Sequence, residues 1–197
     1  MAILGVDDMK GQLTGGGARP NLFQVLMNFP GLVIAANQTK ASFMTRMASL
    51  PASTITNIEV PFRGRKLQIA GDRTFDPWTI TVINDTDFDV RNAFEDWMNM
   101  INQHHENTGL TKPDSYMADM MVEQLDKDGT QLKRYDIRDV WPSSLGAIEL
   151  DYGAESTIEE FTVEFQVQYW TQGKSAPATG NRPKYSPPKH IGGDRFA

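Results

Sequence analysis

Residues 62–85 read FRGRKLQIAGDRTFDPWTITVIND and contain two strand patterns separated by a short polar segment. Polar and apolar residues alternate over residues 66–70 and again over residues 78–83. This period of two is typical of strands that are buried on one face only. The stretch therefore predicts a pair of β-strands and a mainly β fold.

The polar segment between these strands, residues 71–74, predicts a tight corner that joins two antiparallel strands. Gly71 can adopt a positive φ, and the Asp72 side chain can hydrogen-bond the backbone two residues later. Arg73 is interpreted as the partner of Asp72 in an ion pair at this corner. Pro77 has no backbone N–H, so we expect it to open the second strand instead of lying inside it.

Similar alternation along the rest of the chain predicts an antiparallel β-sandwich or barrel. The run 160–170 is the clearest, because its aromatic and aliphatic residues alternate with polar residues. Asp128-Gly129 is a strong signal for a hairpin turn between two such runs, and Pro142 is expected to end the second of them. The strands expected outside residues 50–85 cover residues 22–29, 42–50, 115–125, 131–141, 147–152 and 160–170.

One amphipathic helix is expected over residues 87–106. Apolar residues recur there at helical spacing and form one stripe that would cover a sheet. Thr86 or Asp87 could cap the first turn. His104 and His105 are adjacent and point about 100° apart on a helix, which favours a pair stabilised by the helix dipole over a metal site. The stripe consists of Val90, Phe94, Trp97, Met98 and Ile101.

The length of 197 residues suffices for one domain with a substantial core and two arms. Residues 1–19 form a glycine-rich arm that we expect to be flexible, and residues 20–172 form the β domain. Residues 173–197 are rich in Pro and Gly and carry five Lys/Arg against one Asp, a charge of +4 that leaves −10 for residues 1–172. We expect this basic extension to lie on an acidic neighbouring subunit. The acidic body argues against a DNA-binding module.

The sequence offers little for catalysis, metal binding or membrane insertion. It has no cysteine, which excludes disulfides and thiolate metal sites. No histidine lies in a motif with a nucleophile or at a metal-binding spacing, so we expect no enzymatic activity, no metal and no cofactor. No apolar run approaches the roughly 20 residues of a membrane helix, and the acidic start lacks the basic region of a signal peptide. We therefore expect synthesis in a cytoplasm and no membrane span.

Three blocks of sequence fall in the order and spacing of a known family. They are ARPNLFQV at 18–25, AGDRTFD at 70–76 and WTITVIND at 78–85. Through these blocks, and from about residue 18 to residue 170, the chain closely resembles the tail tube proteins of T4-like contractile-tailed phages. The corner residues of this match are Gly71, Asp72, Arg73 and Trp78.

The resemblance implies a structural virion protein that forms six-membered rings, stacked into the inner tube of a contractile tail. Such a tube conducts the genome when the sheath contracts. The implied partners are other copies of the chain, the tail sheath protein and, in the lumen without specific binding, the tape measure protein and DNA. The implied location is the phage tail, assembled in the host cytoplasm. The family pattern ends near residue 170, so it assigns no role to residues 173–197.

Two other functions remain open at this point. The inner tube of a type VI-like secretion system or of an extracellular contractile injection system is related and would carry protein effectors. A carbohydrate-binding or hydrolytic β-sandwich would bind a ligand without assembling.

In the resembling family, the region between the second strand and the RGRK-type block is a long hairpin that contacts the next ring. This region is residues 50–62 here, and its apolar residues would be costly to leave exposed to water. The residues expected to carry ring stacking are Leu50, Pro51, Ile55 and Ile58.

The wall of a conduit for DNA should be acidic or neutral. Lys and Arg side chains that neutralise phosphates hold DNA through counterion release, whereas a genome in transit must not be held. The wall residues should come from solvent-facing positions of long strands, although alternation does not tell which face turns inward. The candidates are Asp119, Glu123, Glu164, Gln166 and Gln168.

Overall fold

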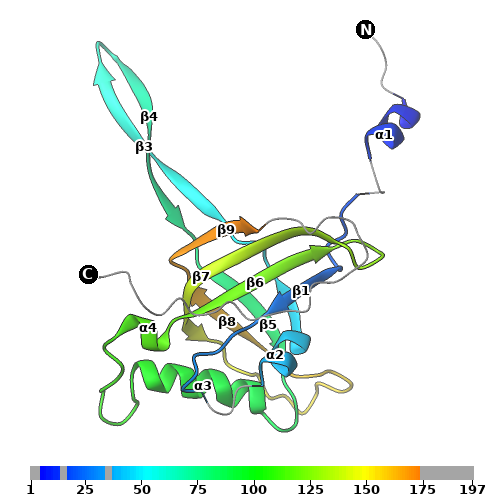
Figure 1. Cartoon of the computed structure of the whole chain (residues 1–197), viewed down its shortest axis with the longest axis vertical. Coiled ribbons are helices and arrows are strands. Elements are labelled where there is room, and N and C mark those ends of the chain that lie inside the picture. Colours follow the sequence, from blue (N-terminus) through cyan, green and yellow to red (C-terminus); the bar gives the residue numbers. More distant parts are fainter. Residues whose placement is uncertain (1–4, 14–16, 34–36, 174–197) are drawn as a thin grey trace.

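The computed structural model describes residues 5–13, 17–33 and 37–173. The fold is mainly β and antiparallel, as the alternation predicts (Figure 1). The strands are β1 (Phe23–Leu26), β2 (Thr45–Ala48), β3 (Ser53–Phe62), β4 (Arg65–Phe75), β5 (Trp78–Ile83), β6 (Ala118–Leu125), β7 (Gln131–Leu145), β8 (Glu160–Gln166) and β9 (Tyr169–Gly173). The helices are α1 (Val6–Gln12), α2 (Gln38–Met44), α3 (Asp89–Ile101) and α4 (Pro113–Tyr116).

The long strand β7 joins two halves of the main sheet. In half A, β1 pairs with β6, β6 with the first part of β7, and β7 with β9. In half B, the last part of β7 pairs with β8, β8 with β5, and β5 with β2. A register shift in the β7–β8 pairing between Pro142 and Ser144 lies where β7 passes into half B. The two halves thereby form the expected sandwich or barrel.

The core lies between the two halves and under α3. On β8, Phe161, Val163 and Phe165 are fully buried, as the alternation of this run predicts. Phe94 and Trp97 of α3 pack on Phe165 with ring centroids 5.9 and 6.2 Å apart. The helix therefore closes the core, because its apolar stripe covers the inner face of β8.

β3 and β4 form a separate two-stranded hairpin that projects from the body on the side away from α3 (Figure 1). Phe62 pairs with Arg65, so only Arg63 and Gly64 form the turn. Both have positive φ, 45° and 82°, which is the conformation of the two-residue turns that suit the twist of a hairpin.

The prediction of a corner at residues 71–74 is wrong. Gly71, Asp72 and Arg73 lie inside β4, whose partner is β3, and β4 reaches β5 through Asp76 and Pro77. Gly71 is instead needed for close approach: a Cβ there would lie 2.7 Å from the Thr56 hydroxyl oxygen. Gly71 lies at a bulge in the ladder. Ile55 pairs with Arg73 and Asn57 pairs with Ala70, so β4 has two residues, 71 and 72, where β3 has one.

Several expected boundaries differ because local structure overrides the strand pattern. Residues 42–44 belong to α2, which is capped by the Asn37 side chain accepting from the Lys40 N–H at 3.0 Å. Pro142 lies inside β7, next to the register shift. The run 160–170 is divided between β8 and β9, and residues 147–152 form no strand.

The helix α3 is shorter than expected. Its N-cap is Phe88 in the left-handed region, not Thr86 or Asp87, and Asn102 ends it with extended backbone. His104 and His105 therefore lie beyond the helix and form no pair at its end. The buried stripe also includes Ala93, which the sequence pattern did not indicate.

The N-terminal arm contains the short helix α1, none of whose residues is buried. Of the C-terminal extension expected over residues 173–197, Gly173 belongs to β9, and residues 174–197 lie outside the described residues.

Candidate assembly surfaces

The hairpin β3–β4 has one apolar face. Ile58 pairs with Ile69 and Val60 with Leu67, and alternation places Phe62 on the same side. These side chains remain 40–67% exposed. Five neighbouring aliphatic and aromatic side chains on a projecting ribbon form an apolar surface of the kind that marks a protein interface.

The other face of the hairpin is polar. Lys66 and Glu59 form an ion pair at 2.5 Å, and the Asn57 side-chain amide hydrogen-bonds that of Gln68. These contacts hold the two strands in register. The ribbon therefore has one polar face and one apolar face that no element of the described residues covers.

The residues expected for ring stacking do not all lie on this ribbon. Ile55 and Ile58 lie on β3 and are about half exposed. Leu50 and Pro51 precede β3, and Pro51 is buried at the base. The expectation did not include Phe62, Leu67 and Ile69, although the alternation of residues 66–70 after Arg63-Gly64 could have indicated them.

The hairpin is fixed to the body at its base. The Trp170 indole N–H donates to the Ala52 carbonyl at 3.1 Å, and the Trp170 ring contacts Phe75 edge-on, with centroids 6.1 Å apart. Trp78, one of the family-matching residues, is buried and donates to the Ser49 carbonyl at 2.7 Å. Base and body are therefore joined by the buried indole of Trp78 and the partly buried indole of Trp170.

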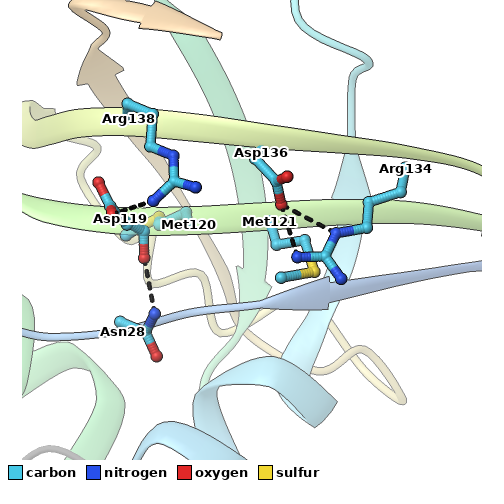
Figure 2. A pocket seen from close by; sticks show the side chains of 7 residues that line it. All are labelled: Asn28, Asp119, Met120, Met121, Arg134, Asp136 and Arg138. Atoms are coloured by element: carbon cyan, nitrogen blue, oxygen red, sulfur yellow. Dashed lines mark hydrogen bonds and ion pairs between the residues drawn. The ribbon is translucent and has the colours of Figure 1, made fainter. Parts of the chain in front are cut away.

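The outer face of half A carries a second, charged surface (Figure 2). Along β6 and β7, charged residues alternate with residues that face the core, such as Met120, Val122 and Ile137. The charged residues are Asp119 and Glu123 of β6 and Arg134, Asp136 and Arg138 of β7. A shallow pocket lies between them and is lined by Asn28, Asp119, Met120, Met121, Arg134, Asp136 and Arg138.

Each arginine of this face is paired with carboxylates. Arg138 lies 2.5 Å from Asp119, and Arg134 lies 2.8 Å from Asp136 and 3.9 Å from Glu123. Burial raises the pKa of Glu123, while the charge of Arg134 opposes that rise. The face thus places three carboxylates around two guanidinium groups.

The remaining wall candidates lie elsewhere. Glu164 and Gln166 are on the outer face of β8 in half B, and Gln168 lies between β8 and β9. Glu160, on the same face of β8 as Glu164, forms an ion pair with Arg46 of β2. Four of the five candidates therefore lie on two different faces of the molecule, and Gln168 lies in a connection.

A third charged cluster joins the two helices α2 and α3. The Lys40 ammonium lies 2.7 Å from Asp85, 2.8 Å from Asp89 and 3.6 Å from Asp87. Hydrogen bonding to Lys40 lowers the pKa of Asp85, and hydrogen bonding to Asp85 and Asp89 raises that of Lys40. One ammonium group thus faces three carboxylates, and a formal charge of −2 remains on the cluster.

Within the described ranges, no group of three or more His, Asp or Glu side chains is placed to hold a metal ion. Nor does any helix of that part of the chain have the length and apolar character needed to cross a bilayer. The prominent surfaces are a projecting apolar ribbon and a charged sheet face, which suit contacts between macromolecules.

A family model for phage tail tube proteins matches residues 18–172. The chain belongs to the phage tail tube protein family. It is 38% identical over 168 residues to the tail tube protein gp19 of Enterobacteria phage T4, a match that covers 84% of this chain and 98% of the relative. The resemblance stated from the three sequence blocks is confirmed, and this tail tube protein is a structural component of a phage virion.

Chains in solved structures of two other particles share the fold. A chain in the cap of the anti-feeding prophage superposes with a TM-score of 0.57 at 18% identity, covering 81% of this tail tube protein and 92% of that chain. A chain in the sheath–tube complex of the extracellular injection system PVC gives 0.52 at 14% identity, with 83% and 96% covered. At these identities the likeness shows the architecture alone.

Proposed function

We propose that copies of this chain form rings that stack into the inner tube of a contractile tail, and that the apolar face of β3–β4 carries the stacking. The observation that carries the proposal is the set of half-exposed side chains at Ile58, Val60, Phe62, Leu67 and Ile69 on a projecting hairpin. Fully burying one such side chain is worth about 1.5–3 kcal/mol. A neighbouring copy that covered the remaining exposed area would therefore stabilise the stack by several such contributions.

Within a ring of six, the outer face of half A would line the bore. β1 and β9 lie at the edges of half A, and the described residues provide no further strand beside either of them. Pairing of these edges between neighbours would continue the sheet around the ring. Asp119 and Glu123 would then face the lumen, and Glu164 and Gln166 of half B would face away from it.

The bore would pass the tape measure protein and DNA without binding them specifically, and the tail sheath protein would surround the tube. The chain belongs to a structural family, and we propose no catalytic role, no metal and no cofactor for it. The alternative is that the tube belongs to an injection or secretion system. The 38% identity to a phage protein, over 98% of the length of that protein, favours a phage tail.

The test of stacking replaces Ile58 and Phe62, which lie on the apolar face, together by Asp. The charges lie on exposed positions, so the subunit should keep its circular dichroism spectrum and its unfolding midpoint. Electron microscopy should show long tubes for the wild-type protein and rings or single subunits for the double variant, because charged side chains would be buried between rings. A double variant that polymerises like the wild type would contradict this role of the hairpin.

The matched control places the same number of charges on the polar face of the same ribbon, as Ile55→Asp with Ala70→Asp, and leaves the contacts of Lys66 with Glu59 and of Asn57 with Gln68 in place. If the apolar face carries the contact, this control should still form tubes. Loss of tubes in both variants would indicate that any added charge on the hairpin is harmful, and would remove the distinction between its faces.

A further inference from the structure

The face proposed to line the bore contains two arginines, and this conflicts with a wall that must not hold DNA. A guanidinium group binds phosphate through two parallel hydrogen bonds, and each phosphate so neutralised releases counterions. Arg134 and Arg138 are only about one-third exposed, but they lie on the outer face and not in the core. Two arginines on a wall that passes DNA would be expected to slow it unless their guanidinium groups are already paired.

The carboxylates around these arginines lie on guanidinium nitrogens that a phosphate would otherwise approach: Nε and Nη2 of Arg134, and Nη1 of Arg138. Asp136 accepts from both the Nε and the Nη2 of Arg134, at 2.9 and 2.8 Å. Asp119 accepts from Arg138 Nη1 at 2.5 Å (Figure 2). Its second oxygen accepts from the Asp139 backbone N–H at 3.1 Å, which fixes the carboxylate in place. Glu123, 3.9 Å from Arg134, adds a third negative charge.

We propose that Asp119 and Asp136 mask Arg138 and Arg134, so that DNA moving along this face meets no free guanidinium group. This inference rests on the proposed bore and goes beyond it, because it assigns the two carboxylates a function in transit. The masked arginines contribute cross-strand pairing between β6 and β7 without offering a phosphate site. The resulting face carries one more negative than positive charge.

Substitution of the carboxylates should therefore create a site for DNA that the wild-type protein lacks. The variant is Asp119→Asn with Asp136→Asn, which keeps the size of both side chains and frees both arginines. The matched control is Glu160→Gln with Glu164→Gln, which removes two carboxylates from half B and frees Arg46. Arg46 is more exposed than either arginine of half A, at 54% of its side chain, so the control is a demanding one.

Tubes are assembled in the presence of a fluorescent duplex of about 20 base pairs, sedimented, and assayed for retained DNA over a range of salt concentrations. Tubes of the Asp119→Asn, Asp136→Asn variant should retain about tenfold more DNA than wild-type tubes at about 50 mM salt, and should lose it steeply as salt rises. The control tubes should retain no more than the wild type. Adding Arg134→Gln and Arg138→Gln to the variant should abolish the retention.

If the variant does not assemble, fluorescence anisotropy of the same duplex with unassembled subunits replaces sedimentation. The Asp119→Asn, Asp136→Asn variant should then bind the duplex more tightly than the wild type and the control do. Retention by the variant no greater than by the wild type, or equal retention by the control, overturns the masking. Failure of the wild-type protein to form tubes at all contradicts the proposed function instead, so the two failures are distinguishable.

Discussion

The pairs β3–β4 and β5–β8 are built from the same kind of sequence and have opposite environments. In β5–β8, Ile80 pairs with Val163 and Trp78 with Phe165, and all four side chains are at most 1% exposed. In β3–β4, the equivalent apolar pairs are 40–59% exposed. The difference is that α3 and half A cover the β5–β8 pair, whereas the β3–β4 pair projects beyond the other described helices and strands (Figure 1).

This comparison separates two uses of an apolar strand face. A buried pair stabilises the subunit, because its side chains are already removed from water in the isolated chain. A two-stranded ribbon on its own is marginal in water, so the hairpin depends on its base and on contacts that assembly would provide. The same substitution should therefore affect folding in one pair and assembly in the other.

The largest effect on folding is expected from Phe165→Ala. Phe165 is fully buried against Trp78, Phe94 and Trp97, and truncation of such a ring costs about 3–5 kcal/mol of unfolding free energy. Phe62→Ala removes the same atoms from a ring that is 67% exposed, and should change the unfolding free energy by less than about 0.5 kcal/mol. Urea titration of both variants measures the contrast, and equal losses would show that the hairpin is part of the subunit core.

A smaller, local effect is expected from Gly71→Ala. The new Cβ would lie 2.7 Å from the Thr56 hydroxyl oxygen and 3.1 Å from Ile58 Cγ1, so the ribbon must shift near its irregularity. Tube formation, followed by light scattering, should require a higher protein concentration, while the unfolding midpoint of the body changes little. Adding Thr56→Ala removes the closest contact and should restore part of the assembly. No change with Gly71→Ala would show that the hairpin tolerates bending.

The smallest effect concerns the contact between α2 and the loop before α3. Because Lys40 lowers the pKa of Asp85 below its ordinary value of 3.8, the ionised carboxylate stabilises the folded state above that value. This stabilisation is lost as the pH falls through the lower folded-state pKa. Asp85→Asn should therefore be less stable than wild type at pH 7, and the difference should close below about pH 4.

The matched control for this prediction is Asp87→Asn. Asp87 lies 3.6 Å from Lys40 and its side chain is 71% exposed, so its loss should produce a smaller difference at pH 7. Denaturant unfolding at several pH values measures both variants. A gap for Asp85→Asn that is independent of pH would contradict the ion pair as its cause.

The sequence by itself determined the class of fold, the strongest strands and the family. The alternation of Phe161, Val163 and Phe165 predicts a strand with one buried face, and the three blocks around residues 18–85 are specific enough to indicate a tail tube protein. The stripe through Val90, Phe94 and Trp97 likewise predicts a helix over a sheet. These features are local, since period and composition within one segment suffice to specify them.

Only the tertiary structure decided where the chain turns and which apolar faces are left uncovered. Gly71 could serve a turn or a close approach between strands, and the partner of β4 settles the choice. Asp119 and Glu164 are both acidic residues on alternating strands, yet they lie on different halves of the sheet. Period two specifies that a strand has two faces, but the layer that covers one of them comes from residues far away in the sequence, such as α3.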